Sequence, residues 1–267
     1  MLFDSIVYGP IHSRRLGVSL GMNLMPTDAK LCTFDCVYCE CGFNGVVPHP
    51  HIPTRTEVSV ALETKLKELS AARVTPDVIT VSGNGEPTLH PDFPGIIEDT
   101  CRLRDRYCPS AKVSVLTNST QLVREDVVQA LLRCDNRILK LDSAITDTMR
   151  LIDQPINAYL TAERMVELLA QFHGCFTLQT CFLRGDVLTP NPDRKDAYLL
   201  GHIDNTTPEE LDAWYKAVRR LQPEHIMIYV IDRATPVKTL EKLSRDEMES
   251  IAEPLRKEGF DISVSAC

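Results

Sequence analysis

The sequence lacks the features of a membrane protein, a secreted protein or a broadly basic protein. No run of about 18 apolar residues occurs among its 267 residues, so we expect no membrane-spanning helix. The beginning, Met1-Leu-Phe-Asp, has no basic region followed by an apolar run, so we expect no signal peptide. The 29 Lys and Arg residues are outnumbered by 37 Asp and Glu, and the net charge of −8 disfavours a broad nucleic-acid-binding surface.

Internal repeats of fixed length and low-complexity segments are also missing. Ten cysteines without a secretion signal indicate a reducing compartment, where thiols stay free or bind metal, so we expect a cytoplasmic protein. Hydrophobic residues make up 43% of the chain, which is ample for a core. We expect a single domain over residues 1–267, which begins with a turn-rich lead at residues 1–17.

The chain alternates between strand signals and helix signals. Strands are expected at 18–24, 78–82, 113–116, 138–141, 176–183 and 225–231. Helices are expected after a cap at Thr56, at 93–107, 122–132 and 161–172, and after caps at Thr207 and Ser244. Because parallel strands need helical crossovers, the fold class is α/β, as a partial (β/α)6 barrel or as an open doubly wound sheet.

Three cysteines are concentrated in the stretch Cys32-Thr-Phe-Asp-Cys36-Val-Tyr-Cys39. A [4Fe–4S] cluster takes four thiolates, so three would leave one iron open for chemistry. The alternatives are three ordinary buried cysteines, or a zinc site that a histidine completes. Cys41 follows closely and is either a redox thiol or a plain one.

Polar residues follow three of the expected strands. The segment Gly83-Asn-Gly-Glu-Pro87 follows the strand at 78–82, and its glycines allow a backbone to approach a ligand closely. Thr117 and Asn118 follow the next strand, and Asp142 follows the one after that. Polar residues at the carboxyl ends of strands line the mouth of a β/α barrel, although a turn-capping role is the alternative.

The cysteine stretch resembles the cluster-binding loop of radical S-adenosylmethionine (radical SAM) enzymes. Over nearly the whole chain, the sequence is similar to wyosine-synthase-related iron–sulfur oxidoreductases. The similar runs are GPIHSRRLGVSLGMNL, CTFDCVYCECG, SGNGEPTLHP, VLTNS and KLDSAITDTMRLIDQP. The resemblance implies a partial (β/α)6 TIM-like barrel with a [4Fe–4S] cluster and SAM as cofactors. It also implies a one-electron reductant, flavodoxin or ferredoxin, and a 5′-deoxyadenosyl radical that takes a hydrogen atom from a substrate.

The resemblance makes Cys32, Cys36 and Cys39 the expected cluster ligands. The residues expected around SAM lie on the cysteine loop and at strand ends: Tyr38, Gly83, Asn84, Gly85, Glu86, Pro87, Thr117, Asn118, Asp142 and Gln179. Catalytic residues are not assigned, and the candidates are Lys140, Cys181 and Arg184. Lys140 alternates out of phase with its leucine neighbours and Cys181 shares a parity with Gln179, so these side chains could face the barrel interior.

The favoured function is that of an enzyme that cleaves SAM and acts on an unidentified substrate, which is a small molecule or a macromolecule. A glycyl-radical activase belongs within this class, although ferredoxin-like cysteine pairs are missing. A wyosine-like tRNA-modifying enzyme is the alternative, and the acidic charge disfavours it. A non-catalytic iron–sulfur protein is the third class, but an electron carrier needs no SAM pocket.

The segment 184–205 interrupts the alternation of strands and helices. It is longer than the connections of about 2–6 residues that are usual in α/β units. We expect a loop that acts as a substrate lid, stiffened by Pro190 and Pro192 and carrying the charged Arg194 and Lys195. A tolerated surface insertion is the alternative. Near the beginning of the chain, the adjacent Arg14 and Arg15 either hold an anion or are structural charges.

Overall fold

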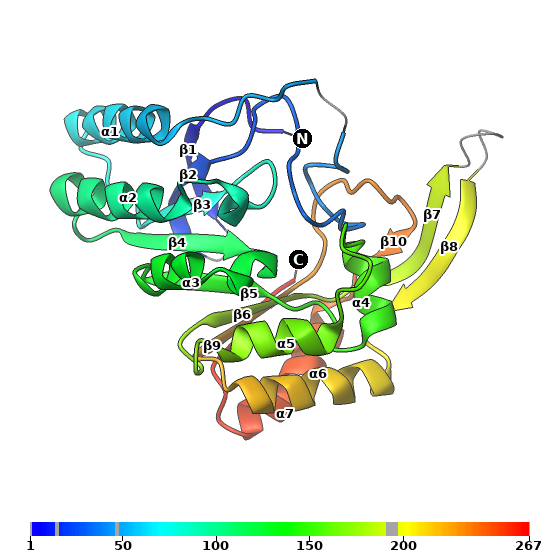
Figure 1. Cartoon of the computed structure of the whole chain (residues 1–267). Helices are drawn as coiled ribbons and strands as arrows, with labels where there is room; N and C mark the ends of the chain where they lie inside the picture. The colour runs from blue at the N-terminus through cyan, green and yellow to red at the C-terminus, as the bar shows by residue number, and fades with distance from the viewer. Residues whose placement is uncertain (1, 14–15, 46–47, 191–196, 267) are drawn as a thin grey trace. The chain divides into compact units, whose positions relative to one another are not determined.

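The structure is a computed structural model that describes residues 2–13, 16–45, 48–190 and 197–266 (Figure 1). The chain divides into two compact units. The first comprises Met1–Cys32 and Asn44–Ile138, and the second comprises Thr33–Phe43 and Leu139–Cys267. Arg14 and Arg15, for which anion binding and a structural role were both left open, lie outside the described residues, as do the expected lid residues Pro192, Arg194 and Lys195.

The first unit is built on parallel strands with one antiparallel edge. Its strands are β1 (Val7–Ser13), β2 (Gly17–Asn23), β3 (Val78–Ser82), β4 (Lys112–Thr117) and β5 (Asn136–Lys140), in the order β1-β2-β3-β4-β5. Only residues 136–138 of β5 belong to this unit. Strand β1 pairs antiparallel with β2, whereas β2, β3 and β4 are parallel. Four of the five residues of β3 are buried, as expected of a central strand that is covered on both faces.

The crossovers of the first unit are helices whose apolar positions recur at helical spacing. They are α1 (Arg55–Ala71), α2 (Phe93–Tyr107) and α3 (Glu125–Leu132), with short 3-10 turns η1 (Pro87–Leu89) and η2 (Thr120–Val123). The prediction of a cap at Thr56 was wrong. Helix α1 begins two residues earlier because Thr54 and Glu57 form a reciprocal capping box, which satisfies two backbone N–H groups at the end of the helix.

The second unit continues the parallel arrangement. Its strands are the end of β5, β6 (Thr177–Cys181), β9 (His225–Tyr229) and β11 (Ile262–Ser265), in the order β5-β6-β9-β11. Its helices are α4 (Thr146–Asp153), α5 (Ala162–Ala170), α6 (Pro208–Leu221) and α7 (Arg245–Lys257). The predicted caps at Thr207 and Ser244 are confirmed, since each side chain accepts a hydrogen bond from the third residue of its helix.

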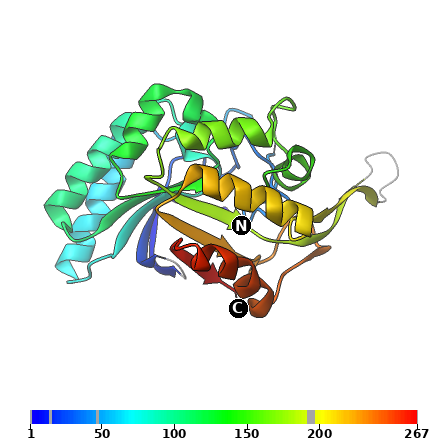
Figure 2. The same cartoon turned by 90° about the horizontal axis from the view of Figure 1, so that it is seen from below.

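The segment 184–205 is not the irregular loop that we predicted. It contains β7 (Arg184–Pro190) and β8 (Ala197–Asp204), which run side by side as an antiparallel pair, and β7 also pairs with β10 (Leu240–Glu241) (Figure 2). Val187 and Ile203 are fully buried, whereas Asp186 between two inward positions is exposed. The charged Asp186 therefore lies on the outer face of β7, opposite to the buried Val187.

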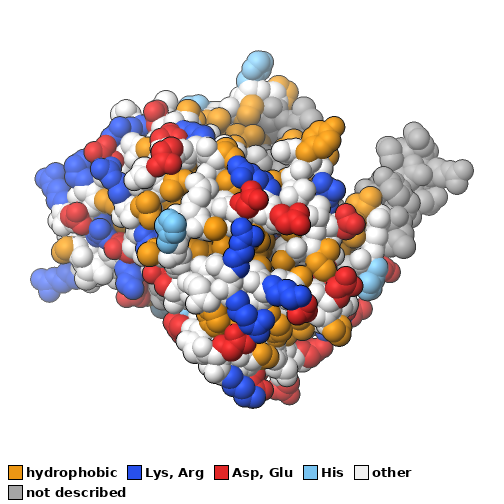
Figure 3. Space-filling model, turned by 60° about the horizontal axis from the view of Figure 1, so that its bottom comes forward, with side chains coloured by type: hydrophobic (Ala, Val, Ile, Leu, Met, Phe, Trp, Pro, Cys, Tyr) orange, Lys and Arg blue, Asp and Glu red, His pale blue; other side chains and the backbone are white. Residues whose placement is uncertain are grey.

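The mostly parallel strands with helical crossovers confirm the predicted α/β class. Strands β1 and β11 and helix α4 had not been predicted. No helix of the described chain is long and apolar enough to span a membrane. On the face that Figure 3 shows, acidic and basic side chains are interspersed rather than gathered by sign.

Candidate functional site

The carboxylate of Glu86 joins the ends of β3 and β4 in the first unit. It is buried, and one oxygen accepts hydrogen bonds from the Thr117 hydroxyl at 2.6 Å and from the Thr88 amide at 3.1 Å. The other oxygen accepts from the Asn118 amide at 2.6 Å. Burial raises the pKa of Glu86, and the hydrogen bonds from Thr117, Thr88 and Asn118 oppose that rise. The predicted SAM residues Glu86, Thr117 and Asn118 thus form one connected group.

The neighbouring Asn84 uses its side chain within the protein. Its amide donates to the Phe3 and Pro26 carbonyls, both at 2.8 Å, and its side-chain oxygen accepts from the Phe3 amide at 2.8 Å. The side chain is fully buried. Asn84 therefore anchors the beginning of the chain, and the part of the Gly83–Pro87 segment that stays available to a ligand is mostly backbone.

Gly85 lies against the residue that precedes the first cysteine. The Leu31 amide donates to the Asn84 carbonyl at 2.9 Å, and the Glu86 amide donates to the Leu31 carbonyl at 3.0 Å. A Cβ atom on Gly85, whose φ is +141°, would lie 1.8 Å from that carbonyl oxygen. The absence of a side chain at Gly85 therefore allows Leu31 to pair with this segment, and it positions the neighbouring Cys32.

Cys32 is held by two asparagines. Its amide donates to the Asn44 side-chain oxygen at 3.0 Å, and its carbonyl accepts from the Asn44 side-chain amide at 3.1 Å. The Asn118 side-chain amide donates to the Cys32 sulfur at 3.5 Å. Thr120 donates twice to the Asn118 side-chain oxygen, which leaves the amide nitrogen of Asn118 directed at the sulfur. An N–H donor on the sulfur suits a thiolate ligand.

In the second unit, the cysteine loop is attached to the end of α4. The Asp35 and Val37 amides donate to the Asp153 and Ile152 carbonyls, both at 2.9 Å. These carbonyls belong to the last turn of α4, where helix geometry leaves acceptors without an intrahelical partner. The Cys39 amide donates to the Cys36 carbonyl at 3.0 Å and closes a turn between the two cysteines. The backbone of this loop is therefore ordered by the protein itself.

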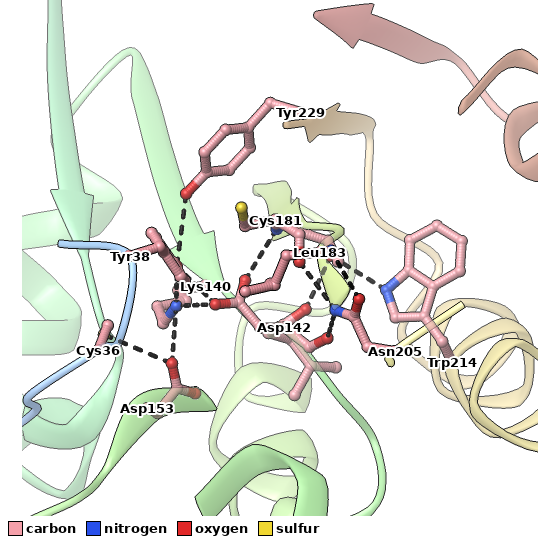
Figure 4. Close-up of polar contacts among 12 residues, drawn as sticks. Cys36, Tyr38, Lys140, Asp142, Asp153, Cys181, Leu183, Asn205, Trp214 and Tyr229 are labelled. Atoms are coloured by element: carbon pink, nitrogen blue, oxygen red, sulfur yellow. Dashed lines mark hydrogen bonds and ion pairs between the residues drawn. The ribbon is translucent and has the colours of Figure 1, made fainter. Parts of the chain in front are cut away.

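Tyr38 of this loop takes part in a cluster of polar and charged side chains, which we call the Lys140 cluster: Tyr38, Lys140, Asp142 and Asp153 (Figure 4). The Lys140 ammonium contacts the Asp142 carboxylate and the Tyr38 hydroxyl, and it lies 2.9 Å from Asp153 Oδ1. Tyr38 also donates to Asp142, and the Cys36 thiol donates to Asp153 Oδ1 at 3.4 Å. Asp142 and Asp153 are both only 2% exposed.

Burial and charge act against each other in this cluster. Burial acts to lower the pKa of Lys140, but the carboxylates of Asp142 and Asp153 outweigh it and hold that pKa well above its usual value. Burial raises the pKa of Asp153 to about 7, although Lys140 opposes this shift. Burial, helped by Asp142, also raises the pKa of Tyr38 well above its usual value. Lys140 is thus a fixed cation beside a neutral phenol.

Asn205 positions Asp142 of the Lys140 cluster through hydrogen bonds. Its side-chain amide donates to the Asp142 and Cys181 carbonyls, both at 2.8 Å, and its side-chain oxygen accepts from the Leu183 amide at 2.9 Å. The Cys181 amide in turn donates to Asp142 Oδ1 at 2.9 Å. These bonds fix the Asp142 carboxylate, and through it they fix Lys140. Sequence reasoning missed Asn205, because it lies in the segment that we had read as a loop.

The remaining candidates occupy separate positions. Gln179 is largely buried in β6, and its carbonyl accepts from the Leu141 amide. The Cys181 side chain is fully buried in an apolar group that includes Val37. Arg184 pairs with Glu247 at 2.7 Å, at the beginning of α7. The structure therefore places only Lys140, of the three catalytic candidates, in a buried polar cluster.

The three expected cluster ligands are half-buried cysteines, and none of them forms a disulfide. Within the described ranges, no three His, Cys, Asp or Glu side chains form a group that could hold a metal ion. The donor set fits an iron–sulfur cluster, since Cys32, Cys36 and Cys39 supply three thiols from one short loop and the Cys32 sulfur already accepts an N–H.

Comparison with known proteins gives a family match. The family model of the Radical SAM superfamily matches residues 29–183. A UPF0026 protein of Methanocaldococcus jannaschii is 32% identical over 204 residues, which cover 76% of this chain and 56% of that protein. A Brachyspira hyodysenteriae protein named GTPase Obg is 30% identical over 250 residues, which cover 91% of this chain and 32% of that protein. The chain thus spans about half the length of the first of these relatives and about a third of the length of the second.

Solved structures share the fold at low sequence identity. Streptococcus suis SuiB bound to S-adenosylmethionine aligns with a TM-score of 0.60 at 13% identity, over 92% of this chain and 50% of SuiB. TYW1 with a lysine–pyruvate adduct aligns with a TM-score of 0.58 at 15% identity, over 90% of this chain and 73% of TYW1. A radical SAM methyltransferase of Sphaerobacter thermophilus aligns with a TM-score of 0.62 at 12% identity, over 92% of this chain and 65% of that enzyme. These alignments confirm the predicted fold of the partial-barrel type.

Proposed function

The chain belongs to the radical SAM superfamily, and we propose that Cys32, Cys36 and Cys39 bind its [4Fe–4S] cluster. Enzymes of this class use the cluster and SAM as cofactors, and the chain is an enzyme of this class. The observation that carries the proposal is the C-x3-C-x2-C spacing of three cysteines on one short loop. When bound, the cluster and SAM would supply the chemistry of the class, in which one electron divides SAM into methionine and a 5′-deoxyadenosyl radical that takes a hydrogen atom from a substrate.

The protein groups around this loop orient the cofactors. We propose that Asn118 stabilises the Cys32 thiolate by hydrogen bonding, because its amide already donates to that sulfur. Asn84 and Glu86 use their side chains within the protein, so the Gly83–Pro87 segment meets SAM through backbone groups. Tyr38, Asp142 and Gln179 remain our proposed contacts to the rest of SAM.

The substrate is not assigned by these residues, and the reductant is proposed as a flavodoxin or a ferredoxin. A wyosine-like activity on tRNA is the alternative. The TYW1 likeness at 15% identity supports only a shared fold, and the net charge of −8 disfavours RNA. The two activities separate by measured tRNA affinity and its dependence on salt. We also propose that the β7–β8 hairpin shapes the substrate side of the site, because it begins where β6 ends.

The test of the proposed function is SAM cleavage. Protein reconstituted with iron and sulfide without oxygen should form 5′-deoxyadenosine and methionine in equal amounts when reductant and SAM are added. The electron paramagnetic resonance spectrum of the reduced cluster should change when SAM binds. Absence of both effects in protein that holds its cluster would refute the proposal.

A further inference from the structure

The Lys140 cluster places a fixed cation close to one expected cluster ligand. The Cys36 sulfur lies 3.4 Å from Asp153 Oδ1, and the Lys140 nitrogen lies 2.9 Å from the same oxygen. The Lys140 nitrogen is therefore at most about 6.3 Å from the sulfur. Figure 4 shows Asp153 between Cys36 and Lys140. All three residues belong to the second unit.

The cation cannot easily leave this position. The Lys140 nitrogen contacts Asp142, Asp153 and the Tyr38 hydroxyl, which come from the segment after β5, from α4 and from the cysteine loop. Asp142 is itself fixed by the Cys181 amide at 2.9 Å. Lys140 is only 9% exposed, so solvent and salt screen its charge weakly.

We propose that Lys140 is a positioning residue that raises the reduction potential of the cluster through its charge beside Cys36, and that Asp153 opposes it. The inference rests on the proposed ligation of the cluster by Cys36. One-electron reduction makes the cluster more negative by one charge, so a nearby cation stabilises the reduced form and a nearby anion destabilises it. Net charge and hydrogen bonds to the ligand sulfurs are among the factors that set iron–sulfur potentials.

A purely structural role for these residues makes a different prediction. If Lys140 and Asp153 only anchored the cysteine loop on α4, removing either one would loosen the loop in a similar way. The potentials of the two variants would then shift in the same direction, or not at all. An electrostatic role requires shifts of opposite sign, because the two side chains carry opposite charges.

The experiment is a redox titration of the reconstituted holoenzyme, followed by electron paramagnetic resonance. Lys140→Met should lower the midpoint potential. Asp153→Asn should raise it, because it removes a negative charge and can donate an N–H to the Cys36 sulfur. Lys140→Arg keeps the charge and should stay closer to the wild type than Lys140→Met does.

Shifts in the same direction in Lys140→Met and Asp153→Asn, or no shift in either, would overturn the inference. If Lys140→Met does not retain a cluster, the nearly isosteric Asp153→Asn decides alone, and an unchanged or lowered potential refutes the proposal. A wild-type protein that binds no cluster would refute the proposed function itself. These two failures are therefore distinguishable.

Discussion

Replacing Gly85 with alanine should destabilise the protein strongly, because the new side chain would collide with a backbone. The Cβ atom would lie 1.8 Å from the Leu31 carbonyl oxygen, far inside the 3.0 Å that real Cβ contacts respect. The φ of +141° adds a strain of about 1–3 kcal/mol for any residue with a side chain. Displacing Leu31 also weakens two hydrogen bonds, which contribute about 1 kcal/mol each. We expect a total loss of about 3–5 kcal/mol in the free energy of unfolding.

Gly259 provides a matched control for this prediction. Its φ is +94°, but a Cβ atom there would meet nothing within 4 Å, so Gly259→Ala should cost only about 1–2 kcal/mol of backbone strain. Urea unfolding of the iron-free protein under reducing conditions, followed by circular dichroism, measures both variants. If Gly85→Ala is no less stable than Gly259→Ala, the contact with Leu31 does not restrict position 85 to glycine.

Three further predictions concern the second unit. Asn205→Ala removes three hydrogen bonds and should lower the free energy of unfolding by about 2–4 kcal/mol in urea, and a loss below about 1 kcal/mol would contradict the role given to Asn205. Trp214→Phe removes the hydrogen bond from the indole to the Thr180 hydroxyl and should lower the free energy of unfolding by about 1–3 kcal/mol. Tyr159→Phe, at a 91% exposed position, should change it by less than about 0.5 kcal/mol, and equal effects of the two substitutions would refute this account. Hydrogen bonds from Ser244 and Arg184 lower the pKa of Glu247 to about 2, below the unfolded value of about 4.3, so its contribution to stability is complete above pH 4.3 and is lost as the pH falls toward about 2. Glu247→Gln should therefore flatten the loss of melting temperature over that range, and parallel curves for the two proteins would count against it.

Local patterns predicted the regular elements of the chain well. The apolar run at 78–82 is β3, and the helical spacing at 93–107 is α2, with the predicted bounds in both cases. These elements bury side chains at regular intervals, and the period is visible in the sequence itself. Helix α4 spans only 8 residues, and such a short helix gives a weaker periodic signal.

Sequence patterns did not predict the polar contacts between residues that are far apart in the chain. Asn84 bonds to Phe3, which is 81 residues away, and no short motif indicates that pairing. The glycines of the Gly83–Pro87 segment were expected to let a backbone approach a ligand, and no pattern indicated the contact of Gly85 with the Leu31 carbonyl. Alternation predicted an inward Lys140, and its side chain is buried. Its partner Asp153 belongs to the helix that had not been predicted.

The most direct test of the central claim is the iron content of cysteine variants after reconstitution without oxygen. We predict about four irons per chain in the wild type and none in the triple variant Cys32→Ala, Cys36→Ala, Cys39→Ala. The control is Cys41→Ala, which changes a thiol two residues beyond the predicted ligands and should keep the full cluster. Full iron content in the triple variant, or loss of the cluster in Cys41→Ala alone, would contradict the assignment of the ligands.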